Sequence, residues 1–332
     1  MIIITMSKQS LTRYLYFLEE VKISFLDALL KKKSLKECYF WISEIFYSGF
    51  IDESWQFIMK IYYDFYYLNN NYIIIKIKAK YKKKNNIKNI LSIVSLLYQM
   101  KHDPYIFICR TNNKGRKTKD ISKTLLNKLK KNECQSVYYY INLMMNIDSN
   151  NCIKIVEKFK GEKFTDLGLY KNKTHLLFAF SCKKYTNNNN NISIKFIKKN
   201  LNHINNLNEA VYPVYKTLNE RRIYDISDDI GCFKLFDKDK FDKKDNFCYN
   251  WEYYCHFSPV WKKRFNCDFK NKKPVFKNID IREEFYNKYN YEPDEKCMLF
   301  LKDITPNKIF VWLKNIYDQN YEKYCYNSLV MY

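Results

Sequence analysis

The sequence predicts a mainly α-helical protein, in which an N-terminal antiparallel helical array is followed by a second, irregular helical domain. Apolar residues recur at helical spacing through much of the chain, and 47% of the 332 residues are apolar, enough for a substantial core. Only five glycines and six prolines interrupt this pattern. Strand-like alternation is confined to short runs of a Lys-rich segment, where at most one short β hairpin is expected.

Composition divides the chain into three regions. Residues 1–68 form the N-terminal helical array, and residues 69–210 form a basic and helical middle region that continues it. The composition changes near Pro213. From there on, acidic and basic residues are mixed, and five of the six prolines occur. Residues 211–332 are therefore assigned to an aromatic-rich C-terminal helical domain.

Three helices with very short connections are predicted in the array. The first extends to the cations at Lys31–Lys33, and a capping box at Ser34–Glu37 begins the second. Gly49 ends the second helix, and the third begins near Asp52. Short connections make the helices antiparallel neighbours. The side chains of the third helix that are expected to point inward are Trp55, Ile58, Met59, Tyr62, Phe65 and Tyr66.

The middle region contains two short runs of uncertain type. Ile73–Lys82 alternates in its latter half, which predicts either a strand with a Lys face or a helix, and Tyr105–Arg110 is predicted as a short strand. Helical spacing predicts further helices at 87–100, 121–131, 135–147, 152–160, 173–184, 192–208, 251–256, 259–265, 281–289 and 306–317.

Charge is strongly segregated along the chain. Residues 69–132 hold 17 Lys and Arg against two Asp, which is +15 of the net charge of +23. A concentrated cationic segment attracts polyanions, and cations that neutralise phosphates release counterions. The sequence therefore predicts sequence-independent nucleic-acid binding. The candidate contacts are Lys76, Lys78, Lys80, Lys82, Lys83, Lys84, Lys88, Arg110, Lys114, Arg116, Lys117 and Lys119.

Nearby aromatic residues could stack on unpaired bases. They are Tyr72, Tyr81, Tyr98, Tyr105 and Phe107. Two other interpretations of the segment stay open. An A/T-biased genome would enrich Lys, Asn, Ile, Tyr and Phe without selection for function, leaving a solvated Lys face. Lysines also attract anionic lipid, which would give a membrane-surface role.

No motif for catalysis, a cofactor or a metal is recognised. In Asn113–Thr118, Arg116 separates Gly115 from Lys117, so the segment is not a phosphate-binding loop. The spacing of Cys248, Cys255, His256 and Cys267 is unlike that of structural zinc sites. Two carboxylate groups are interpreted as turn and helix-start residues: Asp225, Asp228 and Asp229, and Glu292, Asp294 and Glu295.

The cysteines and the apolar runs suggest a cytoplasmic protein. Eleven cysteines are scattered singly, and Met1–Met6 is too short for the apolar core of a secretory signal. Reduced thiols are therefore expected. The longest apolar run, around Ile51–Leu68, is broken by Lys60 and Asp64, so no transmembrane segment is expected.

Three stretches together resemble a family of uncharacterised, largely helical proteins of nucleocytoplasmic large (giant) DNA viruses. They are Phe40–Phe50 (FWISEIFYSGF), Ser258–Arg264 (SPVWKKR) and Glu283–Glu295, which begins EEFY and ends YEPDE. The resemblance covers residues 1–68 and parts of 217–300 but not the basic segment. It implies a helical fold, a viral source, and a place in the infected-cell cytoplasm, the virus factory or the virion. It supplies no catalytic residues.

The leading hypothesis is therefore a non-enzymatic protein that binds nucleic acid through residues 76–119, without a cofactor, a metal or a small-molecule site. The main alternative is a helical scaffold or virion structural protein that binds another protein through residues 11–68. A third class, an enzyme built on Asp225, Asp229 and Glu295, would require a concave acidic pocket.

Overall fold

The computed structural model describes residues 10–13, 18–30, 32, 34–111, 113–182 and 250–289. In these ranges the protein is mainly helical, with one two-stranded antiparallel sheet, which confirms the predicted fold class. The chain forms two compact units: unit 1 is Met1–Ser54 with Asn202–Tyr332, and unit 2 is Trp55–Leu201. This division differs from the boundaries at 68 and 210 that composition suggests. The predicted helices at 192–208 and 306–317 lie outside the described residues.

In unit 1, helices α1 (Leu18–Leu30) and α2 (Leu35–Tyr47) pack on each other, as the predicted array requires. The predicted cap of α2 forms, because the Ser34 hydroxyl accepts a hydrogen bond from the Glu37 amide at 3.2 Å. Gly49 follows α2 with φ of 92°. A Cβ at Gly49 would lie 2.6 Å from Pro259 Cβ, so only glycine permits this close approach.

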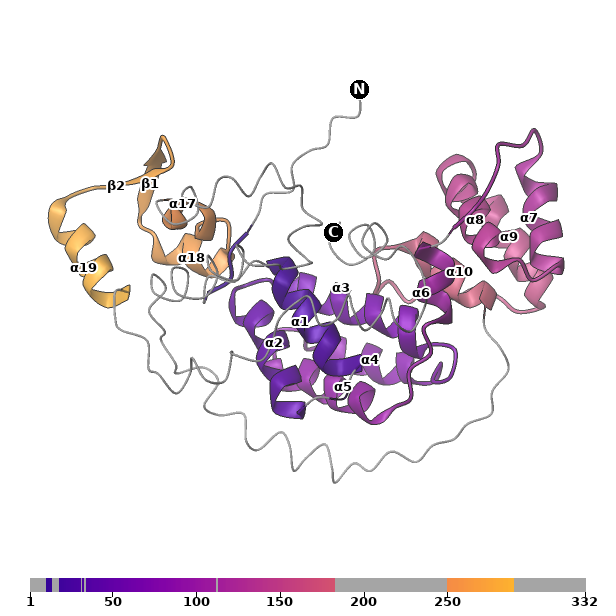
Figure 1. Cartoon of the computed structure of the whole chain (residues 1–332), viewed down its shortest axis with the longest axis horizontal. Helices are drawn as coiled ribbons and strands as arrows, with labels where there is room; N and C mark the ends of the chain where they lie inside the picture. The colour runs from indigo at the N-terminus through magenta and orange to yellow at the C-terminus, as the bar shows by residue number, and fades with distance from the viewer. Residues whose placement is uncertain are drawn as a thin grey trace, which may run out of the picture. The chain divides into compact units, whose positions relative to one another are not determined.

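The C-terminal residues of unit 1 that the structure describes, 250–289, form a small module, which we call the hairpin module (orange to yellow in Figure 1). It contains α17 (Trp251–Cys255), α18 (Pro259–Arg264), β1 (Cys267–Lys270), β2 (Lys273–Phe276) and α19 (Ile279–Tyr289). The strands pair with Cys267 opposite Phe276 and Lys270 opposite Lys273. Their two-residue turn, Asn271–Lys272, has positive φ at both positions, as type I′ turns do.

The segment Ser10–Arg13 joins the hairpin module to α2. The Arg13 guanidinium lies 2.8 Å from the Glu44 carboxylate, and both side chains are buried. The Arg13 amide donates to the Ser48 hydroxyl at 2.8 Å, while the Trp261 indole donates to the Arg13 carbonyl at 3.2 Å. The described parts of the three stretches of the resemblance contact one another: the Ser258 hydroxyl donates to the Ser48 carbonyl at 2.8 Å, and the Phe285 ring of α19 lies 6.4 Å from the Trp261 ring.

Unit 2 is built from helices only, in the part of it that the structure describes. α3 (Ile51–Ile61) crosses the unit boundary and continues as a π-helical turn, η1 (Tyr62–Tyr66). All six side chains predicted to point inward from this helix are buried. The helices that follow are α4 (Ile73–Tyr81), α5 (Ile87–Gln99), α6 (Tyr105–Thr111), α7 (Ile121–Lys130), α8 (Cys134–Ile147), α9 (Ser149–Lys160) and α10 (Lys173–Cys182).

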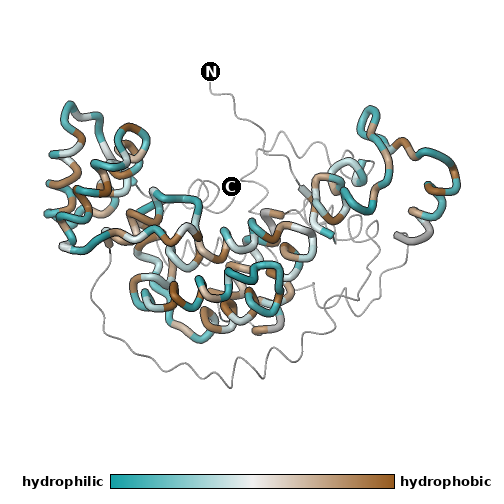
Figure 2. The backbone as a smooth tube through the Cα atoms, turned by 180° about the vertical axis from the view of Figure 1, so that it is seen from behind, coloured by the Kyte–Doolittle hydropathy of each residue, from teal (hydrophilic) through white to brown (hydrophobic). Residues whose placement is uncertain are grey.

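Packing in unit 2 follows the amphipathic pattern of these helices. α4 pairs with α5, α7 to α9 pack together, and α8 also contacts α6 and α10. Figure 2 shows hydrophobic and hydrophilic residues interspersed along the helical parts of the tube, as expected where one face of a helix is buried. In α10, by contrast, every residue from His175 to Cys182 is buried.

The sequence prediction is wrong for one short run and resolved for another. Tyr105–Arg110, predicted as a strand, lies in helix α6, which starts where the Asp103 carboxylate accepts a hydrogen bond from the Tyr105 amide at 2.9 Å. Ile73–Lys82 is also helical, because Ile73 and Ile77, four residues apart, are both buried on one helix face. The hairpin occurs at Cys267–Phe276 rather than in the basic segment.

None of the helices in the described ranges combines the length and the apolar character that crossing a membrane requires.

Candidate nucleic-acid interface

Six exposed lysines lie on α4, on the turn that joins α4 to α5, and at the start of α5. We call them the turn cluster: Lys76, Lys78, Lys80, Lys82, Lys83 and Lys88. Side chains from α3 and α5 hold the turn in place by donating hydrogen bonds to its backbone. The Trp55 indole donates to the Lys84 carbonyl at 3.0 Å, and the side-chain amide of Asn89 donates to the Lys83 carbonyl at 2.9 Å. Lys84 itself is half-buried, so its side chain is less available than the other six.

A second group of exposed cations lies on the loop between α6 and α7. We call it the loop cluster: Lys114, Arg116, Lys117 and Lys119. The loop is fixed to α8. The Lys114 amide donates to the Gln135 carbonyl at 3.4 Å, and the Tyr140 hydroxyl donates to the Arg116 carbonyl at 2.9 Å. The backbone thus forms the attachment, and the cationic side chains point away from it into solvent.

Gly115 allows this attachment. A Cβ there would lie 1.9 Å from Cδ1 of the Tyr139 ring, so any other residue would force the loop or the Tyr139 ring to shift. The two ends of the loop are also defined. The Asn113 side chain donates to the Arg110 carbonyl at the end of α6, and the Asp120 carboxylate accepts from the Lys123 amide at the start of α7, both at 2.9 Å.

The two acidic residues of the basic segment serve as local caps. Asp103 caps α6 and Asp120 caps α7, through the hydrogen bonds described above. No Asp or Glu occurs between Asp64 and Asp103 in the sequence. The turn cluster therefore has no acidic residue near it in sequence.

Arg110 is not a phosphate contact, contrary to the sequence prediction. Its guanidinium binds the Asp64 carboxylate through two hydrogen bonds of 2.9 and 2.7 Å, and the two side chains are only 6% and 1% exposed. Burial by itself would raise the pKa of Asp64, but the Arg110 and His175 side chains overcome this and hold the pKa well below its usual range.

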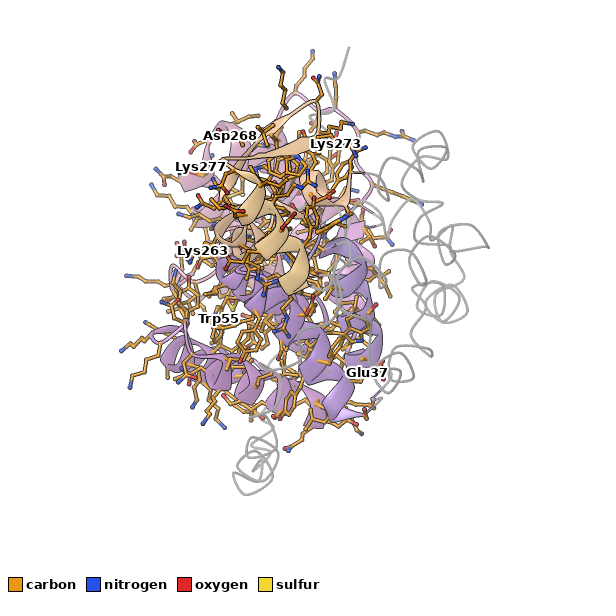
Figure 3. All side chains as sticks on the ribbon, turned by 90° about the vertical axis from the view of Figure 1, so that its left-hand side faces the viewer. Glu37, Trp55, Lys263, Asp268, Lys273 and Lys277 are labelled. Carbon is orange, nitrogen blue, oxygen red and sulfur yellow. The ribbon has the colours of Figure 1, made fainter. Side chains whose placement is uncertain are left out.

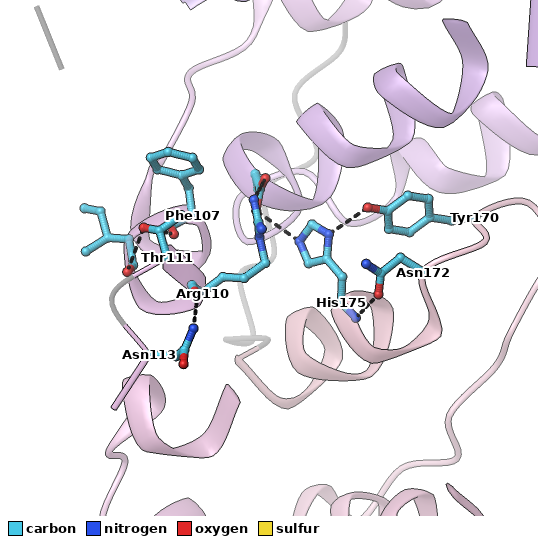
Figure 4. Close-up of polar contacts among 9 residues, drawn as sticks. Phe107, Arg110, Thr111, Asn113, Tyr170, Asn172 and His175 are labelled. Carbon is cyan, nitrogen blue, oxygen red and sulfur yellow. Dashed lines mark hydrogen bonds and ion pairs between the residues drawn. The ribbon is translucent and has the colours of Figure 1, made fainter. Parts of the chain in front are cut away.

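Arg110 and Asp64 belong to a larger buried network. The His175 Nε2 atom lies 3.0 Å from the Asp64 carboxylate, and its Nδ1 atom lies 2.9 Å from the Tyr170 hydroxyl. Figure 4 shows the Arg110, His175 and Tyr170 side chains converging. Burial lowers the pKa of His175 despite the adjacent carboxylate, so neutral imidazole is favoured. Because every side chain of this network is buried, it forms a polar core of unit 2 and offers no surface to a ligand.

One of the candidate base-stacking rings is also inaccessible. Phe107 is buried and stacks on Phe65, with ring centroids 5.0 Å apart and planes at 27°. The other four candidates, Tyr72, Tyr81, Tyr98 and Tyr105, are half-buried. Tyr81 is engaged edge-on with Trp55 at 5.4 Å. The basic segment therefore presents cations to solvent more fully than it presents rings.

Within the described ranges, no three His, Cys, Asp or Glu side chains gather in a way that could hold a metal ion. Cys255 is buried and donates to the Glu252 carbonyl at 3.4 Å. Cys109, Cys134 and Cys182 interact in the core of unit 2; hydrogen bonding to Cys134 and burial raise the pKa of Cys109 and of Cys182, which keeps both thiols protonated. Outside the described residues lie Cys248, Asp225, Asp228, Asp229, Glu292, Asp294 and Glu295.

A further cationic surface escaped the sequence analysis. Residues 259–277 contain seven Lys and Arg against one acidic residue, Asp268. This excess of positive charge does not appear in the net charge of residues 217–332, because acidic residues elsewhere in that region balance it. A window of about twenty residues, the size of a supersecondary unit, would have shown it.

Comparisons of the chain with known protein families, with curated proteins and with solved structures found no match. The resemblance to giant-virus proteins therefore stays a prediction.

Proposed function

We propose that this protein is a non-enzymatic, sequence-independent nucleic-acid-binding protein that uses the turn cluster and the loop cluster of unit 2. The observation that carries the proposal is the display of ten exposed cations on backbone held in place by hydrogen bonds to α3, α5 and α8. A prearranged set of cations loses little conformational freedom when it meets a phosphate backbone.

The arrangement suits a polymer rather than a single phosphate. The turn cluster lies where α5 begins, whereas the loop cluster follows α6, beyond the other end of α5. Cations on two separate elements can contact several phosphates, as the repeating charge of a nucleic-acid backbone provides.

The same side chains explain why no sequence preference is expected. All but one of the ten are lysines, and a lysine ammonium acts as a point charge. Arg116 is the one member with the planar fork that reads a guanine edge or a phosphate bidentately. Affinity should therefore be dominated by phosphate contacts and should fall steeply with salt.

The test is the salt dependence of binding, measured by fluorescence anisotropy of labelled single-stranded and duplex DNA from about 50 to about 300 mM salt. Replacement of three turn-cluster lysines by glutamine (Lys80→Gln, Lys82→Gln and Lys83→Gln) should reduce the log–log slope by about two to three units. Lys158→Gln, Lys163→Gln and Lys171→Gln provide the matched control, since these lysines are also exposed in unit 2. Equal slopes for the two triple variants would overturn the assignment to the turn cluster.

The alternative is a scaffold that binds a protein through residues 11–68, which would require an exposed apolar patch there. Among side chains whose exposure is described, the exposed large apolar residues are Ile75, Ile147, Phe159, Val275 and Ile279, and none of them lies in that range. The nucleic-acid proposal is therefore preferred.

The proposal includes a reducing, cytoplasmic location. It is supported by the seven cysteines of the described residues, which are all free thiols. The infected-cell cytoplasm, the virus factory or the virion would be the corresponding sites for a viral protein.

A further inference from the structure

The cationic surface at residues 259–277 surrounds a cleft within the hairpin module. The cleft has a volume of about 420 Å³, which is in the range of small-ligand sites. Three rings and two lysines line much of it: His256, Phe265, Phe269, Lys262 and Lys277. This combination of flat apolar groups with cations occurs where nucleotides bind, because a base offers a π-face and a phosphate offers charge.

The rings form one connected platform. The alternation of β1 leaves Phe269 half-buried, while Asp268 and Lys270 on either side of it are exposed. The Phe269 ring contacts the half-buried His256 ring, with centroids 4.7 Å apart, and the buried Phe265 ring supports it at 5.5 Å. Phe269 and His256 thus present partly exposed rings that contact each other, and the buried Phe265 ring packs against Phe269.

The charges around the platform are mainly positive. Lys262 on α18 and Lys277 after β2 are exposed and line the cleft, and Asp268 is the one acidic residue of its lining. Figure 3 shows Asp268, Lys273 and Lys277 on the hairpin. Lys263 and Lys270 are also exposed in the same module, so the field over the cleft is cationic in spite of Asp268.

We propose that this cleft binds one nucleotide of a single-stranded nucleic acid, with the base stacked on Phe269 and His256 and the flanking phosphates contacted by Lys262 and Lys277. In a duplex the bases are already paired and stacked, so they cannot reach the platform. The inference rests on the proposed function only for the class of ligand. It adds to unit 2, which recognises phosphates, a site in unit 1 that distinguishes single strands from duplexes.

Cys267 provides a direct probe, because it is half-buried and lines the cleft. The full-length protein would be alkylated with N-ethylmaleimide, alone or with a saturating oligothymidylate of about 12 nucleotides, enough to cover a single-strand site. Trypsin then releases Phe265–Lys270, in which Cys267 is the one cysteine, and mass spectrometry gives its alkylation rate. Parallel samples contain a duplex, or inorganic polyphosphate of equal charge.

The expected result is alkylation of Cys267 slowed several-fold by the oligothymidylate, and little changed by the duplex or by polyphosphate. Equal protection by polyphosphate would overturn the role of the base. An unchanged rate, under conditions where anisotropy shows the oligothymidylate bound, would overturn the inference and leave the proposed function standing. Absence of binding in the anisotropy assay would overturn both.

Matched variants distinguish the loss of ligand contacts in the cleft from a loss of stability of the hairpin module. Phe269→Ala should abolish the protection, whereas Phe276→Ala, which removes the same side chain from the partner strand and does not line the cleft, should retain it. Lys262→Gln with Lys277→Gln should weaken single-strand binding more than Lys263→Gln with Lys270→Gln. Equal effects within either pair would count against the assigned contacts.

Discussion

Each unit buries one arginine against one carboxylate, yet the two units display their exposed cations differently. Arg13 pairs with Glu44 in unit 1, and Arg110 pairs with Asp64 in unit 2. In unit 2, the exposed cations of the turn cluster and the loop cluster lie on a helix, the turn after it and a loop, where the half-buried Tyr81 ring packs edge-on against Trp55. Those of the hairpin module in unit 1 surround a cleft lined with rings.

The comparison shows that the environment of a cation, and not the local charge density, decides its role. Arg110 and Arg116 lie six residues apart in the same basic segment, but one is a core residue and the other is exposed. Likewise, a cation by itself recognises phosphate, whereas cations that surround a ring-lined cleft can also favour an unpaired base.

Loss of a buried arginine should have the largest effect. Arg110→Leu leaves Asp64 as an uncompensated buried charge and should destabilise unit 2 by about 3–5 kcal/mol. Arg13→Leu should destabilise unit 1 by a similar amount. Arg116→Leu, the exposed comparison, should change stability by less than about 0.5 kcal/mol. Hydrogen exchange resolved by peptide reports each unit separately, and equal effects of Arg110→Leu and Arg116→Leu would contradict the difference between the two positions.

Acidification should weaken unit 2 before unit 1. The pKa of His175 is lowered in the folded state, so the unfolded chain takes up a proton first as the pH falls below about 6.5. Stability should therefore be lost below that pH, by at most about 2 kcal/mol at about pH 5. The pKa of Asp64 is also lowered, so its contribution is lost only in stronger acid, below its usual range.

The control for this pH dependence is His175→Gln, which should remove the loss of stability between about pH 6.5 and pH 5. Peptides from α2 provide an internal comparison, since Glu44 there pairs with Arg13. A loss of protection that is the same in α2 and α10, or that persists in His175→Gln, would show that His175 is not its source.

Displacement of the loop cluster should have a moderate effect. Gly115→Ala places a Cβ against the Tyr139 ring, so the loop or the ring must shift, and we expect the backbone hydrogen bonds between the loop and α8 to weaken. We expect a stability loss of about 1–3 kcal/mol, faster exchange in residues 113–120, and weaker nucleic-acid binding. Tyr139→Ala should partly rescue Gly115→Ala in a double-mutant cycle, whereas purely additive effects would rule out the contact as the cause.

Relief of backbone strain in the hairpin should have the smallest effect. Lys272 adopts φ of 62°, a left-handed conformation that costs a residue with a side chain roughly 1–2 kcal/mol relative to glycine. Its ammonium group also lies 3.4 Å from the Tyr254 hydroxyl, and Lys272→Gly loses this contact. The net result should be a stabilisation of unit 1 by about 0.5–1 kcal/mol. Asn271→Gly should gain less, because asparagine tolerates this conformation, and the reverse order would contradict the strain argument.

The sequence by itself determined those features of the protein that depend on neighbours along the chain. Periodicity located most of the helices, the Ser34 cap formed as expected, and the inward side of α3 was correct at every predicted position. Charge counting identified the exposed lysines of both clusters. These signals depend on residues within about four positions of one another, which is the distance over which a helix repeats.

Only the tertiary structure decided which residues far apart in the chain meet. Arg110 is buried because Asp64, 46 positions earlier, lies opposite it, and nothing near Arg110 in the sequence distinguishes it from Arg116. In the same way, Trp261 reaches Arg13 across 248 positions, which brings the C-terminal module to the N-terminal helices. Tertiary packing also made Tyr105–Arg110 a helix, since short apolar runs suit either conformation until a neighbouring surface selects one.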